Sequence, residues 1–97
     1  MISNEYILTS VSDILGVPIK EILKQDHQKG ARNMHAVKAR HFCMYFSVIY
    51  GNHNTTDLGK YYGKRDHSTI SNALKKFYIR LSTDKKYVLD LEMCEEQ

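Results

Sequence analysis

The sequence predicts an all-α fold, a small domain built from several helices. Two observations predict it. Apolar residues recur at helical spacing (i, i+3, i+4, i+7) along most of the 97-residue chain, and capping residues stand just before several of these stripes. The only proline is Pro18, which excludes long Pro-rich linkers. We therefore expect residues 1–97 to form a single domain.

The first two helices are expected to supply core. Residues 4–15 carry one apolar stripe, with Ser3 or Asn4 as a candidate cap and Gly16 as the end. Residues 18–23 then open on a proline, which suits the first turn of a short helix. Neither helix carries residues that point to chemistry.

A long central helix is expected over residues 34–50, after a polar loop over residues 25–33. Its apolar face is broad and contains two phenylalanines, as expected for the helix that organises the core. A last helix is expected over about residues 83–95, with Ser82 or Thr83 as its candidate N-cap. It either packs back on the domain or forms a self-association surface, and the sequence leaves both open.

Residues 54–80 have the pattern of a helix-turn-helix. Asn54 is a candidate cap for a short helix that Gly63 ends, and Asp66 can cap the next helix by accepting N–H groups at Ser68 and Thr69. The second helix then carries an apolar stripe at positions 70, 73, 74 and 77. Two helices joined by a short glycine-containing turn define the motif.

The polar side of this second helix is typical of a helix that reads base edges from its first turn. Short polar side chains come first and lysines follow: His67, Ser68, Thr69, Asn72, Lys75 and Lys76. An ordinary amphipathic surface helix with a good cap explains the periodicity equally well. The helix start just upstream favours the first interpretation.

Charge is distributed unevenly along the chain. The net charge is +3, but residues 20–80 contain twelve basic side chains against four acidic ones. The last eight residues contain four acidic side chains and no basic one. A basic middle suits a polyanionic partner, although solvated helix faces look the same in a sequence.

Several classes of protein are disfavoured. Cys43 and Cys94 do not form a disulfide framework, so we expect a reducing, cytoplasmic setting, and we expect neither a signal peptide nor a membrane-spanning run. The histidines and cysteines do not match metal-ligand spacings, and no catalytic motif or phosphate-binding loop is present. We expect no enzyme activity, no cofactor and no metal.

The run Gly63-Lys64-Arg65-Asp66-His67-Ser68-Thr69 resembles the signature G-G-R-D-H-T-T of the C-terminal DNA-binding domain of the bacterial replication initiator DnaA. Asp57-Leu58-Gly59 extends the likeness upstream, and weaker matches carry it over residues 7–80. The resemblance implies a DnaA C-terminal or Trp-repressor-like fold. It also implies sequence-specific binding of double-stranded DNA in the nucleoid, in replication control or transcription regulation.

The resemblance implies site residues as well. Base contacts are expected from Arg32 in the minor groove and, in the major groove, from Arg65, Asp66, His67, Ser68 and Thr69. Phosphate contacts are expected from Lys38, Arg40, His41, Lys64, Asn72, Lys75 and Lys76. Three positions depart from the family pattern: Lys64 replaces a glycine, Ala39 a proline and Val48 a basic residue.

One further alternative stays open. A basic surface also suits a protein-interaction module that binds an acidic partner, with the final helix as a candidate contact. Such a module would bind without regard to DNA sequence.

Overall fold

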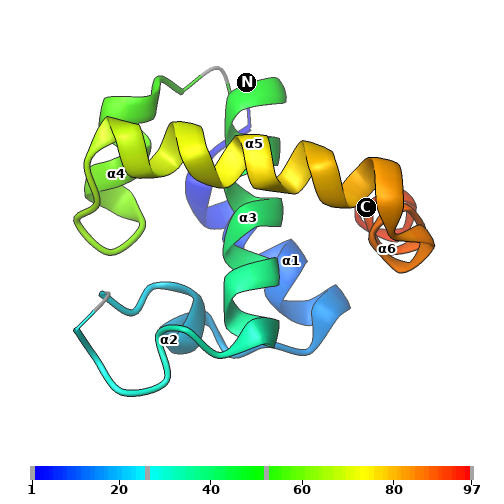
Figure 1. Cartoon of the computed structure of the whole chain (residues 1–97), viewed down its shortest axis with the longest axis horizontal. Coiled ribbons are helices and arrows are strands. Elements are labelled where there is room, and N and C mark those ends of the chain that lie inside the picture. Colours follow the sequence, from blue (N-terminus) through cyan, green and yellow to red (C-terminus); the bar gives the residue numbers. More distant parts are fainter. Residues whose placement is uncertain (1, 26, 52, 97) are drawn as a thin grey trace.

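The computed structural model describes residues 2–25, 27–51 and 53–96, and this part of the chain contains helices and no strand (Figure 1). The all-α prediction is confirmed. The helices are α1 (Asn4–Leu15), α2 (Ile19–Ile22), α3 (Met34–Ile49), α4 (Thr55–Tyr61), α5 (His67–Thr83) and α6 (Lys85–Glu95). Asp26, in the expected 25–33 loop, lies outside the described residues. No helix in the described ranges is long and apolar enough to cross a membrane.

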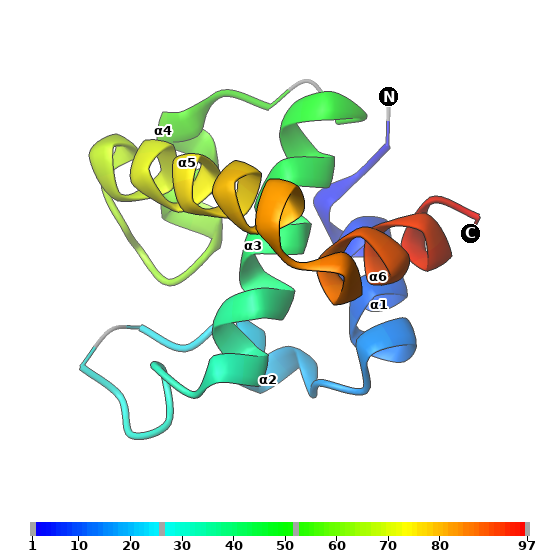
Figure 2. The same cartoon turned by 45° about the vertical axis from the view of Figure 1, so that its right-hand side comes forward.

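Helix α3 is the centre of the fold. α1 packs along it, α5 crosses it, and α6 lies near the opposite end of α5 from α4 (Figures 1 and 2). The Phe42 ring of α3 lies 5.0 Å from the Phe77 ring of α5 and 5.8 Å from the Tyr87 ring of α6, measured between centroids. Because burying a phenylalanine contributes about 1.5–3 kcal/mol, Phe42 and Phe77 account for much of the stability of this junction.

The ends of the helices follow the capping residues in the sequence, with one exception. Ser3 caps α1 by accepting the Tyr6 N–H at 3.2 Å. For α6 the predicted caps were wrong: Asp84 caps it, accepting the Lys86 N–H at 2.9 Å. Ser82 and Thr83 still belong to α5, and their hydroxyl groups donate to its own main chain instead.

An ion-pair cluster fixes α6 to α3. Lys38 Nζ lies 2.6 Å from Asp90 Oδ2, and Lys86 Nζ lies 3.1 Å from Asp90 Oδ1. Burial alone raises the pKa of Asp90, but the hydrogen bonds and charges of the two lysines outweigh it and leave that pKa below its ordinary value. Lys38 also lies over the Tyr87 ring, 4.5 Å from its centroid. α6 therefore packs back against the domain.

Candidate nucleic-acid interface

The helix-turn-helix is formed by α4, the turn of residues 62–66, and α5. Asn54 caps α4 by accepting the Asp57 N–H at 2.8 Å. Asp66 caps α5 by accepting the Thr69 N–H at 2.9 Å and the Thr69 hydroxyl at 3.0 Å. These bonds, the main-chain one first, lower the pKa of Asp66, so its exposed carboxylate stays ionised at the start of α5. Both predicted caps are confirmed.

The turn depends on an unusually close approach between α4 and the residue before the Asp66 cap. Arg65 N–H donates to the Gly59 carbonyl at 2.7 Å. A Cβ added at Gly59 would lie 1.9 Å from the Arg65 carbonyl oxygen, so only glycine fits there. The chain then reverses through two left-handed residues, Gly63 at φ 80° and Lys64 at φ 56°. Lys64 occupies a conformation that glycine adopts without strain.

Arg65 lies inside this turn. Its side chain is buried at 9% exposure, and its guanidinium donates to the Tyr62 carbonyl and, at 3.0 Å, to the Lys24 carbonyl. It thereby ties the turn to the segment after α2. The sequence placed Arg65 on the base-reading surface, whereas the structure directs its guanidinium at main-chain oxygens.

Arg40 likewise holds main-chain segments together, in its case α2 and the loop before α3. It is 4% exposed, and its guanidinium donates to the carbonyls of Ile22 at 2.7 Å, Glu21 at 3.1 Å and Ala31 at 3.2 Å. Two of these carbonyls belong to the C-terminal end of α2, where carbonyl oxygens point outward and favour a cation. Arg40 and Lys38, from which phosphate contacts were expected, thus both have internal hydrogen-bond partners in this structure.

The remaining predicted residues lie on the outside. Asp66, His67 and Ser68 are exposed at the open end of α5, and Thr69, which follows them, is half-buried. The exposed residues further along α5 and in the turn are Lys64, Asn72, Lys75 and Lys76.

A shallow cavity of about 270 Å³ lies between α3, α5 and the loop that joins α2 to α3; we call it the α3–α5 groove. Its exposed rim includes Arg32 from the loop together with Asn72 and Lys76 from α5. Figures 1 and 2 show this loop on the same side of the molecule as the α4–α5 turn. The structure thus brings Arg32 to the polar side of α5, although forty residues of chain separate it from Asn72.

The wall of the α3–α5 groove includes Arg40, His41 and Arg65. Burial, and then the charges of Arg40, Lys76 and Arg65, lower the pKa of His41 to about 4. His41 is therefore neutral at pH 7, and the fixed charge of the groove comes from its arginines and lysine.

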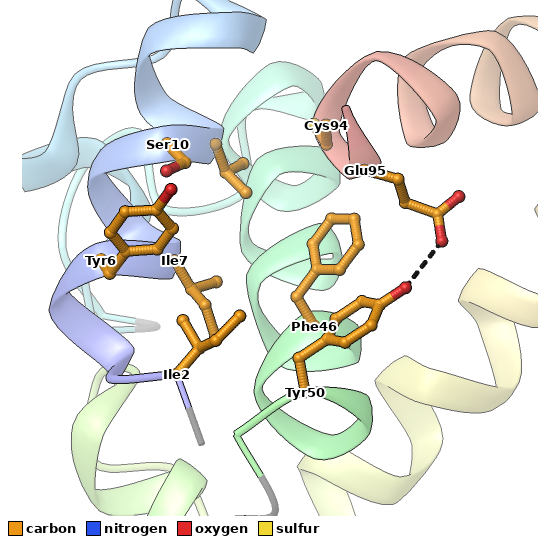
Figure 3. Close-up of a pocket in the computed structure, with 9 residues that line it drawn as sticks. Ile2, Tyr6, Ile7, Ser10, Phe46, Tyr50, Cys94 and Glu95 are labelled. Atoms are coloured by element: carbon orange, nitrogen blue, oxygen red, sulfur yellow. Dashed lines mark hydrogen bonds between the residues drawn. The ribbon is translucent and has the colours of Figure 1, made fainter. Parts of the chain in front are cut away.

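A second cavity of about 160 Å³ lies between α1, α3 and the end of α6 (Figure 3). Its lining is mostly apolar and aromatic and contains no basic side chain; at its edge the Tyr50 hydroxyl donates to Glu95 at 2.9 Å. Among the described residues, no group of three or more His, Cys, Asp or Glu side chains is placed to hold a metal ion. The start of α5 and the adjoining α3–α5 groove, in contrast, form a basic, polar site.

The fold and this site define a protein of the helix-turn-helix class. The profile of a family described as the bacterial dnaA protein helix-turn-helix matches residues 4–77. The chain belongs to this family.

Individual relatives agree. The chain is 30% identical over 98 residues to the chromosomal replication initiator protein DnaA of Bacteroides thetaiotaomicron, covering 98% of this chain and 21% of the relative. It is 35% identical over 96 residues to that of Rickettsia bellii, covering 97% and 19%, and 35% identical over 86 residues to that of Mycoplasma capricolum, covering 80% and 19%. The chain thus spans about one fifth of the length of these relatives.

Proposed function

We propose that this protein binds double-stranded DNA in a sequence-specific manner, with the start of α5 in the major groove and Arg32 in the neighbouring minor groove. One observation carries the proposal: the polar first half of α5 and the distant Arg32 border the same α3–α5 groove. A helix entering the major groove and an arginine entering a narrow minor groove are complementary ways of reading a duplex.

Base contacts are assigned to Arg32, Asp66, His67, Ser68 and Thr69. The carboxylate of Asp66 is exposed, and it can accept a hydrogen bond from cytosine N4 while it caps the helix. Thr69 already donates its hydroxyl to Asp66, so its methyl group is the part offered to a base. Arg65 becomes a positioning residue, because its guanidinium holds the turn that aims these side chains.

Phosphate contacts are assigned to His41, Lys64, Asn72, Lys75 and Lys76. All except the half-buried His41 are exposed, and the lysines can neutralise phosphates without first breaking an internal bond of the kind that Lys38 makes. Arg40 and Lys38 are assigned to the scaffold.

In the cell, we propose a role in replication control, in which the protein occupies sites of the kind that initiator proteins recognise. The relatives are named as chromosomal replication initiators, and the helix-turn-helix family covers most of this chain. Regulation of transcription from such sites is the second candidate, because the same contacts serve both roles. Since the chain spans about one fifth of these relatives, opening of an origin is not assigned to it.

The test is selection from a pool of random duplexes, followed by binding of variants to the selected site and to unrelated DNA. His67→Ala should weaken binding to the selected site by about 1–3 kcal/mol and leave unrelated DNA almost unchanged. The matched control is Lys75→Ala, which should weaken both alike and reduce the salt slope by about one unit. No enrichment, or equal losses for His67→Ala on both duplexes, would contradict direct readout and favour the interaction module.

A further inference from the structure

His41 differs from the other residues assigned to phosphate contacts, because it is half-buried and neutral at pH 7. It lines the α3–α5 groove and also an adjoining cavity of about 220 Å³ that extends toward α6. Arg32, Val37 and Lys76 are the other residues common to both. The imidazole therefore sits where three elements meet: the α2–α3 loop, α3 and α5.

The charged and titratable groups that face this position are almost all cationic. Arg40 and Arg65 lie in the wall, with their guanidinium groups on main-chain carbonyls, while Arg32 and Lys76 lie at the rim. Arg80 and Tyr87 line the adjoining cavity. Among the described residues, neither cavity is lined by a carboxylate.

An imidazole in such surroundings is neutral because its positive form would be poorly solvated and, in addition, repelled by the neighbouring cations. The pKa of His41 is accordingly lowered to about 4. A neutral imidazole offers one N–H donor and one acceptor, whereas a phosphate offers acceptors only. The unliganded groove is thus complementary to an anion in its fixed charge but mismatched to it at one nitrogen of His41.

We infer that the α3–α5 groove binds one phosphate group of the DNA backbone and that His41 takes up a proton from solvent when it does so. The inference rests on the proposed function and specifies one contact within it. Burial and, after it, the charges of the neighbouring cations keep the imidazole neutral in the free protein. The phosphate offsets those charges and supplies a hydrogen-bond acceptor, and the imidazolium then presents N–H donors on both nitrogens. His41 is the phosphate ligand that is charged only in the complex.

Proton uptake makes the affinity depend on pH in a defined direction. The pKa of His41 is higher in the complex than in the free protein, so affinity rises as the pH falls below the value in the complex. At most one proton is taken up, which limits the gain to about tenfold per pH unit. Above the pKa in the complex, the contribution of this site to the pH dependence disappears.

The experiment uses the whole chain and its selected duplex. Binding is measured by fluorescence anisotropy between pH 5.5 and 8, and by titration calorimetry at pH 6 in two buffers of different ionisation enthalpy. The test variant is His41→Gln, which keeps an amide donor and does not titrate. The control is His35→Gln, since His35 is exposed at the start of α3 and lines neither cavity.

The wild type and His35→Gln should bind the duplex more tightly as the pH falls. On binding, each should take up more protons than His41→Gln does, by at most one. The imidazole proton shifts of His41 in the wild-type complex, followed by NMR, should report the same protonation without any substitution. Equal pH slopes and equal proton uptake for wild type and His41→Gln, or a His41 that stays neutral in the complex at pH 6, would overturn the inference and leave DNA binding intact. Absence of duplex binding by the wild type would overturn the proposed function as well.

Discussion

Two sets of basic side chains lie within one small region and are used in opposite ways. At the junction of α2, α3 and the α4–α5 turn, Arg40 and Arg65 are buried and donate to main-chain carbonyls. Around them, Lys64, Lys75 and Lys76 are exposed. The difference shows that a high density of positive charge does not by itself define a binding surface.

The chemistry of the side chains explains the division. The guanidinium of arginine is planar and has five N–H donors, so it can satisfy several carbonyls at once and remain charged when buried. The ammonium group of lysine is compact and strongly hydrated, and it remains more stable in water. In this region the two buried arginines therefore hold the scaffold, and the three exposed lysines present positive charge at the surface.

The largest expected effect on stability comes from a substitution that disrupts the scaffold and leaves every basic side chain in place. Gly59→Ala puts a methyl group against the Arg65 carbonyl, and neither main-chain segment can move away easily. We expect a loss of more than about 3 kcal/mol in the free energy of unfolding, measured by urea denaturation. The control is Gly16→Ala, where nothing lies within 4 Å and only the left-handed conformation is strained, at about 1–2 kcal/mol. Equal losses would mean that the close approach does not matter.

The comparison between arginines and lysines can be tested directly. Arg65→Ala leaves buried carbonyls without a donor, so we expect it to lower the free energy of unfolding by about 2–3 kcal/mol. Lys75→Ala should change it by less than about 0.5 kcal/mol, because Lys75 is exposed. The comparison would be broken if Arg65→Ala were as stable as wild type and weakened DNA binding alone.

His41 is half-buried and belongs to neither set, and its burial should make the stability of the fold depend on pH. Its pKa is lowered to about 4 in the folded protein, against an ordinary value of 6.5, so the unfolded chain takes up the proton first as pH falls. Between pH 7 and pH 5 the free energy of unfolding should fall by about 2 kcal/mol from this group, and the loss should be complete below its folded pKa. His41→Gln should flatten this part of the stability curve. The pKa values of Asp66 and Asp90 are lowered by folding, so the losses from these groups come mainly below their ordinary pKa of 3.8, outside this window.

The smallest expected effect is a gain in stability, from a substitution in the α4–α5 turn. Lys64→Gly removes the strain of a left-handed lysine, partly offset by the greater freedom of glycine in the unfolded chain. We expect a gain of about 0.5 kcal/mol in thermal or urea denaturation. The same variant should bind all duplexes more weakly, because it removes an exposed cation. A loss of stability would show that Lys64 has a structural role of its own.

Much of this architecture was predictable because it is local. Asn54 and Asp66 cap their helices through bonds to residues three positions away, and Gly63 takes the left-handed conformation that ends α4. Spacing within a short stretch of sequence contains all the information that such features need.

The interior partners were not predictable, because they come from distant segments. Arg40, Arg65 and Lys38 form hydrogen bonds to residues 18, 41 and 52 positions away, respectively. The periodicity of apolar residues predicts which face of a helix is buried, but not which segment packs against that face. For Arg40 a signal did exist: it stands four residues after Ala36 and three before Cys43, on the buried side of α3. An arginine at such a position needs internal acceptors, and this would have distinguished it from a phosphate ligand.

Tyr50, at the end of α3, meets both described ends of the chain. Its carbonyl accepts the Ile2 N–H at 3.3 Å, and its hydroxyl donates to Glu95 at 2.9 Å. Figure 2 shows these ends together on the side of the molecule away from the α4–α5 turn. A fluorophore, an affinity tag or a second module can therefore be attached at either end with a short tether, and neither would obstruct a duplex lying against the opposite face.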